Sequence, residues 1–121
     1  MNILITGGSG FIGKVIIDDL LKTNNNILSI SRKKKLSFSK NLKWLKADIS
    51  NVKNYKNAIL DFKPDILIHL SWDKIPNFSK KNCDENFKNS KILLNFIIKY
   101  TKCKKIIISG SCFEYSKKKK L

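Results

Sequence analysis

The 121-residue sequence predicts an α/β fold, a doubly wound parallel sheet of about five strands. Three observations support this prediction. Short runs rich in isoleucine and leucine, typical of fully buried strands, alternate with longer stretches whose apolar residues recur at helical spacing. Strands separated by helices pair in parallel. A glycine-rich turn follows the first apolar run directly, where a sheet of this kind can bind a ligand.

The first part of the chain predicts three strands and one helix. NILIT (2–6) is a buried strand that ends in glycines, and a helix with one apolar stripe follows it over 11–22. NILSIS (26–31) is the second strand, after an asparagine turn. LKWLKAD (42–48) alternates in polarity, which predicts a third strand near an edge of the sheet. The polar link before it is short of a full helix.

The second part predicts two helices and two strands in alternation. They are a helix, a strand entered through a proline, a long amphipathic helix and a fifth strand, at 51–62, 64–70, 82–101 and 104–111. Ser50 is the expected N-cap of the first of these helices. His69 has an apolar residue on either side, which predicts a core position.

The formal net charge of +16 is of the kind often found in nucleic-acid-binding domains. However, its basic residues are lysine except for Arg32, and they are scattered over every expected helix and loop. Surfaces that read RNA or DNA usually add arginines and aromatic residues in one stripe. We therefore expect a solvated lysine surface without a specific nucleic-acid partner. It should attract polyanions weakly, in a salt-dependent manner, and help to draw in a phosphate-bearing small ligand.

Several other classes of protein are disfavoured. No apolar run reaches the ~20 residues that cross a bilayer, and the N-terminus lacks the basic region of a signal peptide, so we expect no membrane contact and a cytoplasmic location. Cys83, Cys103 and Cys112 cannot all pair and show no C-x-x-C spacing, which predicts reduced thiols. The single histidine excludes most zinc-site patterns, so we expect no metal site.

The segment TGGSGFIG places three glycines between the first strand and the first helix. Gly7 allows the sharp turn, Gly10 lets backbone amides approach a pyrophosphate, and Gly13 lets the helix pack closely on the sheet. The N-terminus of the helix adds unpaired N–H groups and a positive dipole end. The segment predicts a Rossmann-like dinucleotide site, the alternative being a turn that is merely structural.

TGGSGFIG also resembles the glycine turn of the extended short-chain dehydrogenase/reductases, the NAD(P)-dependent epimerase/dehydratase family. Further segments resemble this family in order: ADIS, DILIHLSW, ENFKNSKILLNFI and KIIISGSCFEYS, at 47–50, 65–72, 85–97 and 105–116. The resemblance spans the whole chain but corresponds to the N-terminal part of the family's length. Members act mostly on nucleotide-linked sugars or related small molecules. HLSW and GSCFEY are most similar to a subset of sugar-nucleotide ketoreductases and epimerases.

The resemblance implies positions for a dinucleotide cofactor. The glycine turn would hold the pyrophosphate through Gly7, Gly10, Phe11, Ile12 and Gly13. Asp48 and Ile49 would meet the adenine, with the carboxylate accepting from its amino group. The alternative for Asp48 is a helix cap or turn residue.

On the other side of the cofactor, the resemblance implies that Leu70, Ser71 and Trp72 lie beside the phosphate and the nicotinamide ribose. Asn86 would face the same cleft from the following helix, the alternative being a solvated helix residue.

The end of the second strand predicts which cofactor is preferred. An acidic residue there would bind the adenosine ribose and select NAD, whereas this chain has Ser31 and Arg32 followed by lysines. A guanidinium with a hydroxyl nearby suits a 2′-phosphate. The sequence therefore favours NADP over NAD, although the general richness in lysine could account for the charges next to Arg32.

The catalytic set that the resemblance implies is incomplete. Ser111 matches the serine that polarises the substrate's oxygen in the family. Tyr115 and Lys119 have the interval of the family's Tyr-x-x-x-Lys pair, but Tyr115 belongs to the segment that ends the fifth strand, and the catalytic tyrosine of the family lies well beyond it. We expect the chain to stop before its general base.

The predicted function is therefore the NAD(P)-binding portion of a sugar-nucleotide epimerase, dehydratase or ketoreductase, not catalytic on its own. Residues 1–121 would form a partial Rossmann domain without the C-terminal part that binds substrate. One alternative is a stand-alone dinucleotide-binding module, and another is a remnant that binds polyanions incidentally. A sheet that lacks a sixth strand would expose an apolar face, which favours a homo-oligomer or a partner chain.

Overall fold

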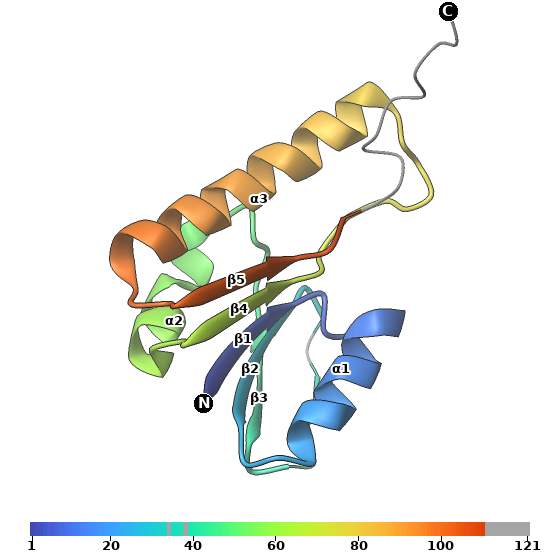
Figure 1. Cartoon of the computed structure of the whole chain (residues 1–121). Helices are drawn as coiled ribbons and strands as arrows, with labels where there is room; N and C mark the ends of the chain where they lie inside the picture. The colour runs from blue at the N-terminus through green and yellow to red at the C-terminus, as the bar shows by residue number, and fades with distance from the viewer. Residues whose placement is uncertain (34, 38, 111–121) are drawn as a thin grey trace, which may run out of the picture.

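The structure, a computed structural model, describes residues 1–33, 35–37 and 39–110, and its framework is one parallel sheet (Figure 1). The sheet has five strands in the order β3-β2-β1-β4-β5, and every pairing is parallel. The strands are β1 (Asn2–Thr6), β2 (Asn26–Ser31), β3 (Leu42–Lys46), β4 (Ile66–His69) and β5 (Lys105–Ile108). The predicted doubly wound α/β fold is thus confirmed, with β3 at one edge as its alternation indicated.

Helices cover both faces of the sheet (Figure 1). They are α1 (Phe11–Leu21), the 3₁₀ turn η1 (Val52–Asn54), α2 (Lys56–Phe62) and α3 (Lys80–Tyr100). α1 covers one face, where Ile17 packs with Ile3 and Ile5 of β1. α2 and α3 cover the opposite face, and their buried side chains meet the alternate residues of the same strands, Leu4 and Leu28 among them. This double burial explains why β1 and β2 are apolar almost throughout.

The predicted helix over 51–62 is wrong at its start, and so is the predicted N-cap. The segment opens with η1, where the side chain of Asn51 accepts a hydrogen bond from the amide of Lys53 at 3.2 Å. α2 begins only after Tyr55, whose backbone (φ −134°) is not helical. Ser50 lies one residue before this cap, in the preceding turn, where its amide donates to the carboxylate of Asp48 at 2.9 Å.

Other boundaries differ by a few residues. α3 begins at Lys80, earlier than predicted, because Ser79 caps it by accepting from the amide of Asn82 at 3.4 Å. β3, β4 and β5 are shorter than predicted: β3 ends two residues early, and β4 and β5 are shortened at both ends. The described residues between β2 and β3 contain no helix, as the short link predicted.

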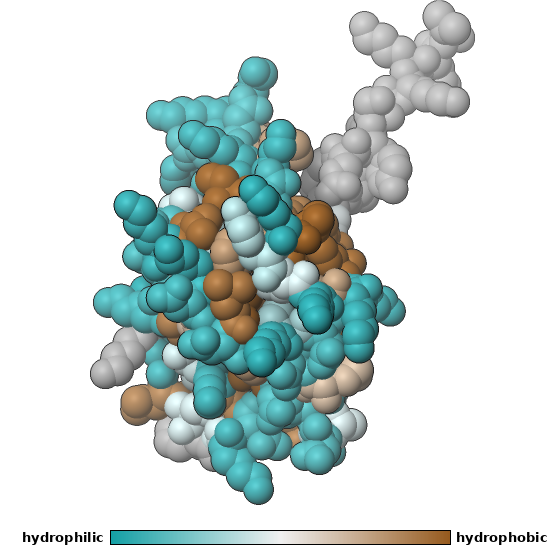
Figure 2. Space-filling view, turned by 90° about the vertical axis from the view of Figure 1, so that its left-hand side faces the viewer, coloured by the Kyte–Doolittle hydropathy of each residue, from teal (hydrophilic) through white to brown (hydrophobic). Residues whose placement is uncertain are grey.

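The surface of the described residues is rich in exposed lysines from the helices, the two edge strands and the loops. Figure 2 shows hydrophilic side chains spread over one face of the molecule, with apolar patches between them and no single stripe of either kind. No helix within the described ranges is long and apolar enough to span a bilayer. Cys83 and Cys103 are free thiols, and Cys112 lies outside the described residues.

Candidate functional site

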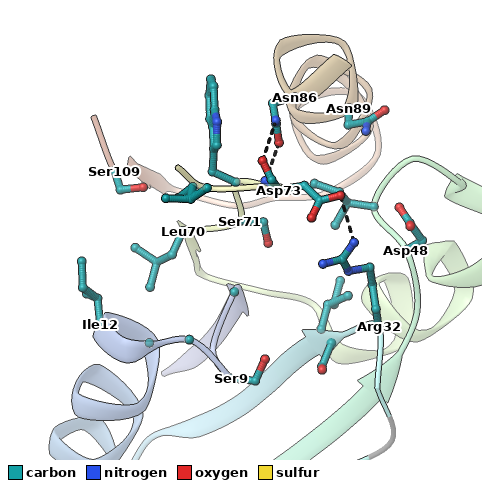
Figure 3. Close-up of a pocket in the computed structure, with 18 of the residues that line it drawn as sticks. Ser9, Ile12, Arg32, Asp48, Leu70, Ser71, Asp73, Asn86, Asn89 and Ser109 are labelled. Atoms are coloured by element: carbon teal, nitrogen blue, oxygen red, sulfur yellow. Dashed lines mark hydrogen bonds and ion pairs between the residues drawn. The ribbon is translucent and has the colours of Figure 1, made fainter. Parts of the chain in front are cut away.

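A cavity of about 520 Å³ opens at the carboxyl ends of the strands (Figure 3). The strand order reverses between β1 and β4, so the loops that follow these two strands diverge and leave a crevice between them. The predicted site residues that line it are Gly7, Gly10, Phe11, Ile12, Gly13, Ser31, Arg32, Asp48, Ile49, Leu70, Ser71, Trp72 and Asn86. The fold therefore brings together every predicted cofactor-binding residue, from five separate segments.

The β1–α1 turn needs glycine at two positions for its own shape. Gly7 has a positive φ of 75°, and a Cβ there would lie 2.9 Å from the backbone of both Leu70 and Ser71. A Cβ on Gly13 would overlap the carbonyl oxygen of Gly7 and the Cα of Gly8. These glycines let the turn, the first helical turn of α1 and the end of β4 lie in close contact.

Gly10 differs from these two because an added Cβ would have only one close neighbour in the protein. Gly10 is the N-cap of α1 with extended backbone, and a Cβ there would meet only the carbonyl oxygen of Gly7, at 3.2 Å. No side chain caps this helix and its first turn holds no acidic residue. The N–H groups and the positive end of the helix dipole therefore face the cavity without a protein anion against them.

The opposite end of the cavity lies beside β2 and β3. Ser31 is buried and Arg32 exposed where β2 ends, and Asp48 is exposed just after β3. One oxygen of Asp48 accepts from the amide of Ser50, so the alternative of a turn residue holds for that oxygen. The residue nevertheless lines the cavity, next to Ile49.

Arg32 forms an ion pair at this end of the cavity with Asp73, a residue that was not predicted to belong to the site. Its Nη1 lies 3.0 Å from Oδ2 of Asp73, in the loop between β4 and α3 (Figure 3). Partial burial raises the pKa of the Asp73 carboxyl, but the hydrogen bonds from Arg32 and from the amide of Lys74 outweigh it, and the pKa falls below its ordinary value. The carboxylate is therefore charged at neutral pH, and the pair is electrically neutral.

Asn86 fixes the β4–α3 loop. Its Oδ1 accepts from the amide of Asp73 at 2.6 Å, and its Nδ2 donates to the carbonyls of Asp73 (3.2 Å) and Asn82 (2.9 Å). Asn82 adds bonds from its own Nδ2 to the carbonyls of Asp73 and Asn77. Asn86 is buried rather than solvated, and its amide is engaged by backbone although it lines the cavity.

A chain of hydrogen bonds joins the two sides of the crevice beneath the cavity. The hydroxyl of Thr6 lies 2.6 Å from Nδ1 of His69, and Nε2 of His69 lies 2.8 Å from the hydroxyl of Ser90 in α3. The hydroxyl of Thr6 also accepts from the amide of Ser71 (3.4 Å), so it contacts both His69 and the residue two places after it. Burial lowers the pKa of His69, which keeps the ring neutral. The predicted core position of this histidine is confirmed.

Further residues line the cavity without having been predicted: Ser9, Asp73, Ile75, Asn89 and Ser109. Ser109 follows β5, and its amide donates to the carbonyl of His69 at 3.1 Å. Asp73 and Ser109 each follow an apolar run that forms a strand, and that position was the one signal in the sequence that could have revealed them. Ser111, Tyr115 and Lys119 lie outside the described residues. Within the described ranges, no three metal-binding side chains gather into a possible ion site.

Comparison with known proteins gives consistent matches. The model of the NAD dependent epimerase/dehydratase family matches residues 3–121. A probable dTDP-glucose 4,6-dehydratase of Sinorhizobium fredii is 32% identical over 97 residues, which are 70% of this chain and 27% of that protein. A UDP-glucose 4-epimerase of Mycolicibacterium smegmatis is 32% identical over 79 residues, 59% of this chain and 25% of that protein.

Among solved structures, the UDP-glucose 4-epimerase of Thermotoga maritima with UDP-glucose superposes with a TM-score of 0.76 at 25% identity. The match covers 92% of this chain and 38% of that one. The chain thus spans about a quarter of the length of the curated relatives it matches.

Proposed function

The chain belongs to the NAD dependent epimerase/dehydratase family, and from that premise we propose that the crevice between the β1–α1 turn and the β4–α3 loop binds a nicotinamide dinucleotide. One observation carries the proposal. Gly10 lies at a helix N-terminus that opens into the cavity, and a Cβ there would meet fewer atoms of the protein than one on Gly7, Gly8 or Gly13. A side chain at this position would stand where a pyrophosphate approaches the amides of α1.

Each part of the cofactor has a matching part of the crevice. The pyrophosphate lies on the backbone of Gly7, Gly10, Phe11, Ile12 and Gly13. Ser31 and Arg32 meet the adenosine ribose, and Asp48 and Ile49 meet the adenine. Leu70, Ser71 and Trp72 border the nicotinamide half. Asn86 acts through the loop it holds, since its amide is occupied by backbone groups.

Both forms of the cofactor are candidates. Arg32 supports NADP, because a guanidinium suits a 2′-phosphate. The ion pair with Asp73 opposes this preference, since the phosphate would approach a neutral pair rather than a free cation. The family description, which specifies NAD, agrees with the second consideration.

We propose that the described residues bind the cofactor for a reaction whose substrate is a nucleotide-linked sugar. The matched relatives are an epimerase and a dehydratase of such sugars. A bound dinucleotide supplies hydride transfer, and Ser111 is the candidate to polarise the substrate's oxygen. No tyrosine or lysine among the described residues lines the cavity, so the general acid/base is assigned to residues outside them.

Titration calorimetry with NAD⁺ and NADP⁺ tests the proposal, with Gly10→Ala as the decisive variant. We expect saturable binding at about 300 mM salt, where exposed charges are largely screened. Gly10→Ala should weaken it at least about tenfold, because a methyl group blocks the approach to the helix amides. Its melting temperature should stay close to that of the parent.

Two results would contradict the proposal. Binding that vanishes above about 200 mM salt, with no preference for dinucleotides over inorganic pyrophosphate, would indicate incidental binding of polyanions. Equal affinity of the parent and Gly10→Ala would place the ligand elsewhere on the chain.

A further inference from the structure

We propose that Asp73 is a specificity-determining residue of this site, one that lowers the preference for NADP relative to NAD by holding Arg32 in a neutral pair. The inference rests on the proposed function, because it concerns how the same crevice treats the 2′ position of the cofactor. Arg32, at the end of β2, would by itself favour the 2′-phosphate of NADP. The β4–α3 loop supplies the carboxylate of Asp73, which pairs with Arg32 and opposes this preference.

The two charges come from opposite sides of the crevice. Arg32 follows β2 and Asp73 follows β4, 41 residues later, yet Nη1 and Oδ2 are 3.0 Å apart (Figure 3). Both residues line the cavity. Any anion that binds the guanidinium in this position therefore lies beside a carboxylate.

The carboxylate is fixed in place more firmly than the guanidinium. The amide and the carbonyl of Asp73 are bound by the buried Asn86, and the carbonyl also by Asn82. Oδ1 of Asp73 accepts from the amide of Lys74 at 2.8 Å. Arg32 has a long side chain with 63% of its area exposed, so it can turn toward a ligand while Asp73 stays.

This difference decides how the two cofactors are treated. A 2′-phosphate gains the guanidinium but must compete with Asp73 for it and is repelled by the remaining carboxylate. A ribose hydroxyl, as in NAD, can donate a hydrogen bond to the same carboxylate without any repulsion. The carboxylate thus takes the place of the acidic residue that the end of β2 lacks.

Asp73→Asn is the test, with Glu85→Gln as its matched control. Asparagine keeps an oxygen for the amide of Lys74 and removes only the charge. Glu85 pairs with Lys74 at 3.1 Å, and its side chain is 46% exposed against 43% for Asp73. It does not line the cavity. Both variants remove one negative charge from the same neighbourhood.

The dissociation constants of NAD⁺ and NADP⁺ are measured for the full chain and its variants at about 100 mM salt. We expect Asp73→Asn to shift the ratio of the two constants about tenfold toward NADP. Glu85→Gln should leave the ratio within about twofold. Arg32→Gln should shift it toward NAD, and in the double variant Arg32→Gln/Asp73→Asn the effect of losing Asp73 should be much smaller than in the parent.

The other outcomes are also decisive. If the parent binds both cofactors but Asp73→Asn and Glu85→Gln change the ratio equally, a general charge effect replaces the proposed one. If the effect of Asp73→Asn persists in full without Arg32, the carboxylate does not act by holding the guanidinium. If the parent binds neither cofactor, the proposed function fails first, and this inference fails with it.

Discussion

The β1–α1 turn and the β4–α3 loop face each other across one crevice but are built by different means. The turn gets its shape from backbone geometry, with glycines where a Cβ would meet other backbone atoms. The loop gets its shape from side-chain amides, chiefly those of Asn82 and Asn86, which bind its carbonyls and one of its amides. A substitution in the turn should therefore destabilise it by steric overlap, whereas a substitution in the loop should destabilise it by removing hydrogen bonds.

The largest effect is expected in the turn. Gly13→Ala should reduce the free energy of unfolding by about 3 kcal/mol, because its methyl group would overlap the backbone of the turn, which cannot move aside as a side chain can. Urea denaturation measures the change, and Gly10→Ala serves as the control, because its Cβ would have one close neighbour, the carbonyl oxygen of Gly7 at 3.2 Å. A similar small loss in both variants would show that the turn is not built by close backbone contact.

A smaller and more local effect is expected in the loop. Asn86→Ala should cost about 2 kcal/mol, because the part-buried amide of Asp73 loses its acceptor and the carbonyl of Asp73 keeps only its bond from Asn82. Hydrogen exchange at the amide of Asp73 should become faster, while exchange in the β1–α1 turn stays unchanged. Faster exchange on both sides would mean that the loop and the turn are held as one unit.

His69 connects the two regions, and its prediction concerns pH. Because burial lowers the pKa of the folded-state ring below its ordinary value of 6.5, the unfolded chain takes up the proton first as the pH falls. The stabilisation is complete above that value and is lost as the pH falls toward the folded-state pKa. The slope is at most ~1.4 kcal/mol per pH unit.

His69→Gln isolates this contribution, since it removes the titrating ring and leaves the carboxylates unchanged. Unfolding free energies of the parent and the variant should converge as the pH is lowered from about 7.5 to about 5. A constant difference over this range would show that His69 titrates alike in the folded and unfolded states.

The smallest effect concerns a cap that is entirely local. Asn51→Ala should cost about 0.5–1 kcal/mol, because Asn51 accepts the amide of Lys53 at the start of η1. Ser50→Ala should cost less, since the structure uses the amide of Ser50 rather than its hydroxyl at this point. The reverse order of these two losses would support Ser50 as the cap after all.

The sequence predicted the turn better than the loop for a physical reason. The glycines, the strand before them and the helix after them lie within a few residues, so their pattern is readable in one short segment. The partners of the loop are 13 residues apart for Asp73 and Asn86, and 41 for Arg32 and Asp73. Nothing in the local pattern at Arg32 indicates a carboxylate opposite it.

The same reasoning explains the errors at element ends. Asn51 and Ser50 are both good caps, and Asn51 is the one used because the 3₁₀ turn η1 begins at Val52, directly after it. The bounds of β1 and β2, in contrast, were predicted correctly, because burial on both faces of the sheet makes their consecutive residues apolar.

The open edge of the sheet at β5 could pair with another copy of the chain, and the high positive charge opposes such association. Within the described residues β5 pairs with β4 alone, and Ile107 and Ile108 are 41% and 53% exposed. Strand edges of this kind invite association between copies. At low ionic strength a net charge of +16 keeps like molecules apart, over a screening distance of about 10 Å at 0.1 M salt. We therefore expect the lysine-rich charge to keep copies of the chain apart, and added salt to lower the concentration at which they associate.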